Sequence, residues 1–321
     1  MTVTVIYFEK VSAEIHKMIE TYKEVTTEIV YWHDLNDSQK EHLLSRAHYF
    51  ITAATPITRS IIEKAPNLKL IQKTGSGVDN IDLEAAEERG ILVASTPGAN
   101  SSSVAEMTIG MILCLYRKLH FLDQETKQGK WLMWEHRPFM FEMKGKTHGI
   151  IGMGHIGKNV AQLSKGFGTD VIYFNRNRLS IEEETRLGIS YTSFTELLRI
   201  SDIVSLHIPL LPETRNLIGE TELNLMKPNA ILINVSRGNI IDEKALVQAL
   251  KTGNLLGVGM DTWSSEPIQA DNPLLQFTNV LATPHVGGGT RDVLENVLRL
   301  SFENIEKVEK AKMPNNLVKK V

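Results

Sequence analysis

The feature that most constrains the fold is a glycine-rich loop near the middle of the chain. Residues 152–157 have the sequence GMGHIG; they follow an apolar strand pattern at 149–151 and open a helical pattern with apolar residues at 156, 160, 163 and 167. A strand, three spaced glycines and a helix in this order are typical of a dinucleotide-binding βαβ unit. The first glycine permits the tight turn, the second lets a pyrophosphate approach the backbone, and the third lets the helix pack on the strand. The N–H groups at the helix start would then face the anion.

Two other interpretations of this loop are open. Gly152 and the Gly157-Lys158 pair also approach a phosphate loop, but Asn159 stands where that motif needs a serine or threonine hydroxyl for magnesium. Nucleotide hydrolysis therefore lacks its metal ligand. A purely structural glycine turn is the other alternative, and dinucleotide binding is the prediction.

The end of the next strand indicates which dinucleotide is bound. An acidic residue about 20 residues past the glycines normally hydrogen-bonds the adenosine ribose. Residues 171–178 have the sequence VIYFNRNR, so Asn175 replaces the acid, and Arg176 and Arg178 follow it. Because a guanidinium is well matched to phosphate, this end of the strand suits a ribose 2′-phosphate and favours NADP. The alternative is that both arginines are solvated loop residues.

Short apolar runs alternate with helical patterns almost from end to end. Strands are expected at 3–8, 28–31, 49–52, 70–73, 91–94, 147–151, 171–174, 203–206, 230–234, 255–260 and 280–282. Such alternation predicts βαβ units and parallel sheets. One long helix is expected at 104–127 and a last one at 290–310. We predict one domain at 100–286 and another built from 1–99 and 287–321, with the C-terminal helix folded back onto the first segment.

Composition excludes several classes of protein. The 321 residues correspond to about two domains at roughly 150 residues each. The 35 basic and 38 acidic residues give a net charge of −3, which provides no basic stripe for nucleic acid. Cys114 is the single cysteine, so an internal disulfide and a cysteine-based zinc site are excluded. The N-terminus lacks the basic segment of a signal peptide, and no apolar run approaches the roughly 20 residues that span a membrane. We expect a cytoplasmic protein.

Three ionisable residues follow the last three predicted strands, where ligands of a doubly wound sheet bind. They are Arg237, Glu266 and His285. A guanidinium can hold a carboxylate in two parallel hydrogen bonds, a histidine can exchange a proton near neutral pH, and a nearby glutamate favours the charged imidazole. Together these groups suit hydride transfer to a 2-keto acid. Taken singly, each has a structural alternative as a helix cap, a turn carboxylate or a loop histidine.

The remaining histidines are weaker candidates for a catalytic role. His207 ends the strand at 203–206 and is expected to line the cofactor site, and His155 lies within the glycine loop. No HExxH motif occurs, and no histidines stand at ligand spacing on a predicted helix, so no metal site is indicated. No GxSxG nucleophile motif occurs either.

Over essentially its whole length, the sequence resembles the D-isomer-specific 2-hydroxyacid dehydrogenases. The resemblance rests on residues 74–82 (TGSGVDNID), 104–106 (VAE), the glycine loop, 207–210 (HIPL) with Thr214, 235–238 (VSRG), 261–267 (DTWSSEP) and 284–285 (PH), in that order. It implies an α/β fold of two doubly wound parallel-sheet domains. A Rossmann cofactor domain would be inserted into a flavodoxin-like substrate domain.

The resemblance also implies roles for individual residues. Arg237 would bind the substrate carboxylate and carbonyl, His285 would be the acid/base, and Glu266 would pair with His285. Backbone N–H groups around Ser76 and Gly77 would hold the carboxylate. The residues expected to contact the dinucleotide are Thr108, Gly152, Gly154, His155, Ile156, Gly157, Asn175, Arg176, His207, Pro209, Thr214, Val235, Ser236, Asp261 and His285.

One departure from the family pattern bears on cofactor and substrate. Most members have aspartate where Asn175 stands and use NAD. The pair Asn175-Arg176 looks more like the NADP-using glyoxylate and hydroxypyruvate reductases, so reduction of one of these two acids with NADPH is expected, with NAD as the alternative cofactor. Residues 73–82 resemble D-3-phosphoglycerate dehydrogenase, which is the alternative enzyme. A non-catalytic dinucleotide-sensing protein is the alternative from another class, and formate or phosphite oxidation is a third.

The resemblance further implies an oligomeric state. Family members are usually homodimers that associate through their cofactor domains, and an arm corresponding to residues 129–141 contributes to the contact. A homodimer is therefore expected. The other expected partner is a small 2-keto or 2-hydroxy acid, with no nucleic acid and no membrane.

Overall fold

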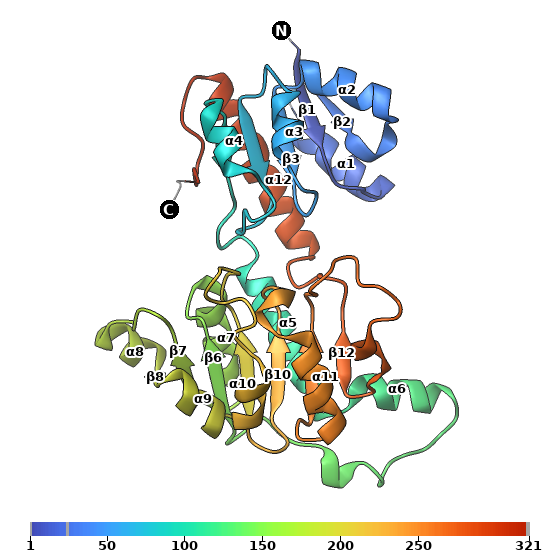
Figure 1. The fold of residues 1–321 in the computed structure, drawn as a ribbon, viewed down its shortest axis with the longest axis vertical. Helices are drawn as coiled ribbons and strands as arrows, with labels where there is room; N and C mark the ends of the chain where they lie inside the picture. Colours follow the sequence, from blue (N-terminus) through green and yellow to red (C-terminus); the bar gives the residue numbers. More distant parts are fainter. Residues whose placement is uncertain (1, 24–25, 319–321) are drawn as a thin grey trace. The chain divides into compact units, whose positions relative to one another are not determined.

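The computed structural model describes residues 2–23 and 26–318 and divides into two compact units (Figure 1). One unit combines Met1–Asn100 with Arg291–Val321, and the other, Ser101–Thr290, is inserted between these segments. All neighbouring strands in the described residues are paired in parallel. The predicted α/β class with parallel sheets is confirmed.

The first unit contains one sheet of five strands in the order β2-β1-β3-β4-β5. This is the flavodoxin-like doubly wound order. The strands are β1 (Val3–Tyr7), β2 (Thr27–Tyr31), β3 (Tyr49–Thr52), β4 (Leu70–Lys73) and β5 (Leu92–Ala94). The helices are α1 (Ala13–Tyr22), the 3-10 turn η1 (Trp32–Asp34), α2 (Asp37–Arg46), α3 (Arg59–Glu63), α4 (Leu83–Glu88) and α12 (Arg291–Glu309).

Alternation along β1 shows how this sheet is buried on both faces. Val5 and Tyr7 belong to one core cluster, which includes residues of α1 and α12. Ile6 and Phe8 belong to the other cluster, which includes residues of α2, α3 and α4. Because successive strand residues point to opposite faces, a strand covered on both sides must be apolar throughout. This explains why β1 is a continuous apolar run apart from Thr4.

The second unit contains a sheet of seven strands in the order β12-β11-β10-β9-β6-β7-β8. The strands are β6 (Thr147–Ile151), β7 (Asp170–Phe174), β8 (Ser190–Tyr191), β9 (Ile203–Leu206), β10 (Ile231–Asn234), β11 (Gly257–Met260) and β12 (Val280–Ala282). The first strand of this unit, β6, lies between β7 and β9, so the chain changes direction across the sheet at this point. In open α/β sheets, this switch point is where ligands bind.

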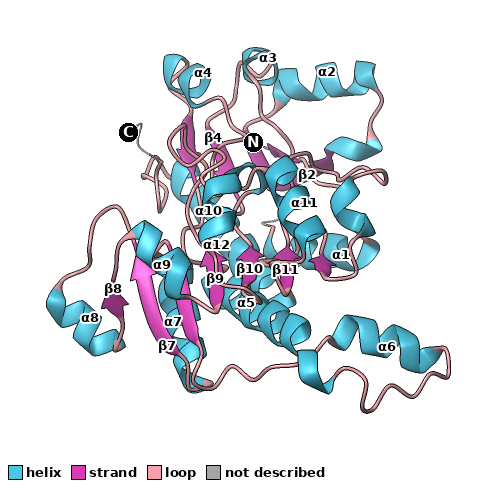
Figure 2. Ribbon diagram, turned by 60° about the horizontal axis from the view of Figure 1, so that its bottom comes forward, coloured by secondary structure: helices cyan, strands magenta, loops and turns pink. Residues whose placement is uncertain are grey.

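Helices cover both faces of the second sheet (Figure 2). They are α5 (Ser101–Tyr116), α6 (Leu119–Lys127), α7 (His155–Gly166), α8 (Ile181–Leu187), α9 (Phe194–Ile200), α10 (Glu220–Leu225) and α11 (Glu243–Thr252), with 3-10 turns η2 (Arg137–Phe139), η3 (Gly238–Ile240) and η4 (Pro273–Gln276). The core clusters place α5 and α7 on one face and α9, α10 and α11 on the other. The carboxyl ends of the strands are left for the loops that carry the site.

The structure corrects the prediction of one long helix at 104–127. The chain forms α5 and then α6, because Lys118 adopts φ 51°. This is left-handed backbone, which an α-helix of L-residues cannot continue. The two-residue strand β8 was not predicted, since it is too short to show alternation. The strands predicted at 91–94 and 255–260 begin later, at Leu92 and Gly257.

Candidate active site

The three glycines of the loop after β6 have three different surroundings. Gly152 adopts φ 101°, and a Cβ there would lie 2.4 Å from the carbonyl oxygen of His207. A Cβ on Gly157 would lie 2.0 Å from the carbonyl oxygen of Gly152. At Gly154, by contrast, no atom lies within 4 Å of an added Cβ. The first and third glycines are therefore required by the fold, and the second faces open space into which a ligand can approach the backbone.

The N-terminus of α7 follows directly from this loop. Gly154 is the N-cap, and no side chain caps the helix. His155 is exposed, while Ile156 is half-buried and packs against the core. An uncapped first turn presents its backbone N–H groups and the positive end of the helix dipole, which together suit a pyrophosphate. The residues present thus fit the phosphates of a dinucleotide.

The end of β7 lies beside the same loop. Asn175 Oδ1 accepts a hydrogen bond from the backbone N–H of Met153 at 3.4 Å. Arg176 is exposed and makes no ion pair with the described residues. Arg178, which the sequence suggested as a second phosphate ligand, instead donates two hydrogen bonds of 2.8 Å to the carboxylate of Glu184. Of the two arginines in this segment, Arg176 is therefore the one whose guanidinium could contact a ribose phosphate.

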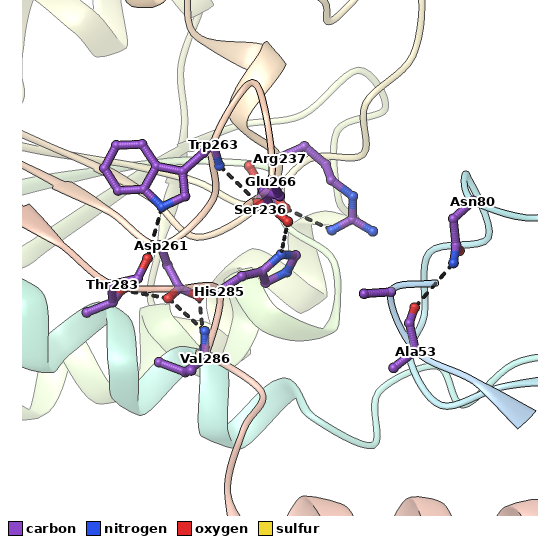
Figure 3. A network of polar contacts seen from close by, with 12 residues as sticks. Ala53, Asn80, Ser236, Arg237, Asp261, Trp263, Glu266, Thr283, His285 and Val286 are labelled. Atoms are coloured by element: carbon purple, nitrogen blue, oxygen red, sulfur yellow. Dashed lines mark hydrogen bonds and ion pairs between the residues drawn. The ribbon is translucent and has the colours of Figure 1, made fainter. Parts of the chain in front are cut away.

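Three neighbouring strand ends carry the predicted catalytic residues: Arg237 follows β10, Glu266 follows β11 and His285 follows β12. The strands β10, β11 and β12 are adjacent in the sheet. His285 Nδ1 lies 2.8 Å from Glu266 Oε2, and the two side chains are 43% and 37% exposed. Figure 3 shows the His285 imidazole pointing at Glu266, with the Arg237 side chain beside them. The structure thus places the predicted pair together with the arginine beside it.

The charge of Glu266 is set by its neighbours. Partial burial disfavours the carboxylate, but hydrogen bonds from His285 and from the backbone N–H of Trp263 outweigh it. Attraction to His285 and Arg237 acts in the same direction, so the pKa of Glu266 lies below its ordinary value. Glu266 is therefore an anion near neutral pH.

The loop that carries His285 is held by a buried carboxylate. Asp261 accepts hydrogen bonds from the hydroxyl of Thr283 at 2.6 Å and from the backbone N–H groups of Val286 at 2.9 Å and Gly287 at 2.8 Å. His285 itself adopts φ 56°, which is uncommon for a residue with a side chain. Such a conformation persists when the surroundings over-determine it. Asp261, predicted to line the dinucleotide, thus fixes the loop that presents the histidine.

The loop that carries Arg237 is held in a similar way by Asn234, which was not predicted as a functional residue. The buried Asn234 amide donates to the carbonyl of Arg237 at 2.9 Å. Its oxygen accepts from the backbone N–H and the hydroxyl of Ser236, at 3.1 Å and 2.8 Å. A polar residue ending the apolar strand β10 was the available signal. Gly238 completes the arrangement, because a Cβ there would lie 1.9 Å from the carbonyl carbon of Trp263.

The remaining predicted cofactor residues have local partners. The Thr108 hydroxyl donates to the carbonyl of Val104 at 2.8 Å, within α5. The Thr214 hydroxyl donates to the carbonyl of Pro209 at 2.7 Å. Val235 is buried between β10 and the Arg237 loop. Contacts of these residues with a dinucleotide stay predictions.

The predicted carboxylate loop belongs to the first unit. It follows β4, and within it Ser76 is exposed and Gly77 is half-buried. Lys73 Nζ donates to Asn80 Oδ1 at 2.8 Å and also to the carbonyl of Ala53. These bonds tie the two ends of the loop to the end of β3. Binding of substrate by Ser76 and Gly77 stays a prediction.

The described residues contain neither a cluster of metal ligands nor a membrane-spanning helix. Among residues 2–23 and 26–318, no three histidine, cysteine, aspartate or glutamate side chains are grouped as metal ligands would be. In the same part of the chain, no helix has the length and apolar character that crossing a membrane requires.

Comparison with known proteins identifies the family. Residues 109–287 match the model of the D-isomer specific 2-hydroxyacid dehydrogenase NAD binding domain. The glyoxylate reductase of Thermococcus litoralis is 39% identical over 313 residues, which cover 95% of this chain and 93% of that protein. This chain belongs to the D-isomer specific 2-hydroxyacid dehydrogenase family. It is accordingly an oxidoreductase with a nicotinamide dinucleotide cofactor, as predicted.

Other proteins similar to this chain have different names. The D-3-phosphoglycerate dehydrogenase of Methanocaldococcus jannaschii is 39% identical over 285 residues, which cover 87% of this chain and 53% of that protein. Among solved structures, the TT0316 protein from Thermus thermophilus has a TM-score of 0.88 and 32% identity, covering 99% of this chain and 100% of that one. An acyclic imino acid reductase in complex with NADPH and D-Arg has a TM-score of 0.83 and 31% identity, covering 99% and 100%.

Proposed function

We propose that this D-isomer specific 2-hydroxyacid dehydrogenase reduces a small 2-keto acid, glyoxylate or hydroxypyruvate, to the corresponding 2-hydroxy acid with NADPH. The observation that carries the proposal is the contact of 2.8 Å between His285 and Glu266, with Arg237 close enough to lower the pKa of the same carboxylate. Similarity to the glyoxylate reductase of Thermococcus litoralis supports the choice of substrate.

The proposed mechanism gives each residue of this group one task. Arg237 binds the substrate carboxylate through its guanidinium fork. Glu266 accepts a hydrogen bond from Nδ1–H of the protonated His285, which leaves Nε2–H to donate to the substrate carbonyl oxygen. The reduced nicotinamide, when bound, supplies the hydride that the carbonyl carbon accepts. The oxygen then takes the proton from His285, so the products are the hydroxy acid and a neutral imidazole.

The dinucleotide would be held by residues of the second unit. Gly152, Gly154 and Gly157 shape the loop, and the first turn of α7 faces the pyrophosphate. Asn175 places no negative charge at the ribose, and Arg176 supplies a cation beside it. A hydrogen bond to a charged group contributes about 1.5–3 kcal/mol, which corresponds to a preference for NADPH of about tenfold or more.

Steady-state kinetics with a panel of 2-keto acids and both reduced cofactors tests the proposal. We expect the highest kcat/KM with glyoxylate or hydroxypyruvate, and a kcat/KM for NADPH at least about tenfold above that for NADH. Equal or better use of NADH would mean that Arg176 is a solvated loop residue and does not bind a ribose phosphate. A preference for some other keto acid would replace the proposed substrate.

A second candidate is an enzyme that acts on D-3-phosphoglycerate. It is favoured by the 39% identity to the Methanocaldococcus jannaschii enzyme. Oxidation of D-3-phosphoglycerate with either oxidised cofactor decides this point. We expect no formation of reduced cofactor from D-3-phosphoglycerate by a preparation that reduces glyoxylate with NADPH. A dinucleotide-sensing protein without activity is opposed by the complete set Arg237, Glu266 and His285.

We also propose a homodimer in which the second units associate. The arm between α6 and β6 exposes large apolar side chains, among them Trp131 at 77% and Trp134 at 63%. Clustered exposed aromatic residues of this kind usually mark a protein interface. Sedimentation of the purified protein tests this, with a dimer expected for the wild type and dissociation expected for the Trp131→Ser, Trp134→Ser variant. The cytoplasmic location stays a prediction.

A further inference from the structure

The core of the second unit contains a continuous chain of buried polar side chains. His148 in β6 and Ser205 in β9 are both fully buried. Ser205 Oγ lies 2.8 Å from His148 Nε2 and 2.8 Å from His207 Nε2, so one hydroxyl joins the two imidazoles. On the far side, His148 Nδ1 lies 2.8 Å from Ser164 Oγ, which lies 2.7 Å from Thr169 Oγ1. We name Thr169, Ser164, His148, Ser205 and His207 the buried relay.

Both imidazoles of the buried relay are neutral. Burial lowers the pKa of His148 to about 3, and the nearby His207 acts in the same direction. Burial lowers the pKa of His207 to about 3 as well. The hydrogen bonds of both rings within the relay are to hydroxyl groups, which supply no negative charge. A neutral imidazole has one N–H donor and one acceptor nitrogen.

The hydrogen bonds of the buried relay are best satisfied when they all run in one direction. Each hydroxyl and each neutral imidazole has a single proton to donate, and a hydroxyl that accepted from both of its relay neighbours would have no acceptor for its own proton among the described residues. In one direction, Thr169 donates first and His207 is left with an N–H at Nδ1. In the other direction, His207 is left with a bare Nδ1 and Thr169 with a hydroxyl proton for which the described residues offer no acceptor.

The first direction leaves one polar group without a partner, and the second leaves two. Buried donors without partners are costly, so the first direction is favoured. It makes His207 Nδ1 a donor. That atom is shielded from solvent and meets no partner among the described residues.

His207 stands where the dinucleotide is expected. It follows β9 at the switch point next to β6. Its backbone N–H donates to the carbonyl of Ile151 at 2.7 Å. Its carbonyl oxygen packs so closely against Gly152 of the glycine loop that an added Cβ there would lie 2.4 Å from it. The free end of the buried relay therefore lies at the edge of the sheet that binds ligands in this fold.

We propose that the buried relay fixes His207 as the Nδ1–H tautomer, which donates a hydrogen bond to an oxygen acceptor of the bound dinucleotide. His148 and Ser205 are then positioning residues, because they act on the cofactor only through His207. The inference rests on the proposed function in one respect, since it takes the dinucleotide to occupy this site.

Nuclear magnetic resonance of the full-length protein, labelled with ¹⁵N in its histidines, tests the tautomers directly. Without cofactor, we expect an Nδ1–H signal from His207 and an Nε2–H signal from His148, assigned by their loss in His207→Asn and His148→Gln. Addition of NADPH should shift the His207 Nδ1–H signal. An Nε2–H tautomer at His207, an unshifted signal with NADPH bound, or failure of NADPH to bind would each overturn the proposal.

A pair of variants at His148 tests the positioning role by a second readout. His148→Leu removes the donor to Ser205, so we expect a Kd for NADPH about 2–10-fold higher, as loss of one hydrogen bond implies. His148→Gln retains an amide donor and should restore most of the affinity, whereas a merely structural role would make both variants equal. If His148→Leu does not fold, the tautomers measured by resonance in the wild-type protein still decide whether the proposal holds. NADPH binding with the expected shift but without keto-acid turnover would refute the proposed function and leave this inference standing.

Discussion

The second unit uses histidine in two contrasting ways. His285 is 43% exposed and contacts the carboxylate of Glu266. His148 is fully buried and contacts two hydroxyls, and its pKa is lowered to about 3. Burial among neutral groups disfavours the charged imidazole of His148. The partner and the exposure, rather than the residue type, therefore decide whether a histidine can transfer a proton.

The same contrast separates two kinds of function. A histidine that exchanges its proton suits acid/base chemistry, which needs both protonation states in the working pH range. A histidine that stays neutral has a fixed donor and a fixed acceptor, so it can only orient a neighbour. We therefore assign chemistry to His285 and positioning to the buried relay.

Loss of the exposed histidine should have the strongest consequence. His285→Gln removes the proton donor but retains a polar side chain of similar reach. We expect kcat for glyoxylate to fall by about 10²–10⁴-fold, the usual contribution of a positioned acid or base. The Kd for NADPH, measured by fluorescence titration, should change far less than kcat, because the glycine loop and the first turn of α7 are left intact. A near-normal kcat would remove His285 from the mechanism.

The second-largest expected effect concerns Arg237, which binds the substrate carboxylate in the proposed mechanism. Arg237→Lys keeps the charge but loses the planar fork, so one of two parallel hydrogen bonds to the carboxylate is lost. We expect kcat/KM to fall by about 10–100-fold for every keto acid, as hydrogen bonds to charged groups imply. Arg299→Lys on α12 is the matched control, because Arg299 pairs with neighbouring residues of its own helix. Loss confined to one keto acid would argue against a shared carboxylate contact.

A smaller effect compares two arginines that are close in sequence. Arg176→Ala should reduce the ratio of kcat/KM for NADPH to that for NADH by about tenfold, mainly through the KM for NADPH. Arg178→Ala is the control, since Glu184 already holds that guanidinium. We expect the control to retain the preference for NADPH. The reverse outcome would mean that Arg178 leaves Glu184 when cofactor binds.

The smallest expected effect is a pH-dependent change in the free energy of unfolding, and it tests whether Glu266 is charged. Its pKa is lowered, so its ionised form stabilises the folded state above the ordinary value of 4.5, and this contribution is lost as the pH falls through the lowered pKa. Urea unfolding of the wild type and Glu266→Gln at a series of pH values should show a stability difference that is full near neutral pH and shrinks below 4.5. A difference independent of pH would argue against an anionic Glu266.

Much of the site could be predicted because the signals are local. The glycine spacing indicated the loop, and the ends of apolar strands indicated where Arg237, Glu266 and His285 stand. Parallel strands bring their carboxyl ends to one edge, so residues far apart in sequence become neighbours. The contact of 2.8 Å between His285 and Glu266 is an instance.

The rest depends on contacts between distant segments. His148 stands within an apolar strand, and its partners Ser164 and Ser205 lie 16 and 57 residues away. Each of these residues alone is an ordinary polar exception in a core, so only the fold shows that they form a chain. Likewise, Asp261 was expected to line the cofactor, and its contacts with Val286 and Gly287 became visible only in the structure. The left-handed Lys118 that divides α5 from α6 has no sequence signal either, since it is neither glycine nor asparagine.

The most direct test of the proposed activity is a single turnover. The protein, loaded with one equivalent of NADPH, is mixed with glyoxylate, and the absorbance of the reduced nicotinamide is followed. We predict that the absorbance falls to completion, that one hydroxy acid forms for each NADPH consumed, and that the reaction is slowed in His285→Gln but not in the control Arg299→Lys. NADPH that stays reduced in the presence of glyoxylate, hydroxypyruvate and the remaining keto acids of the panel would contradict the proposed activity.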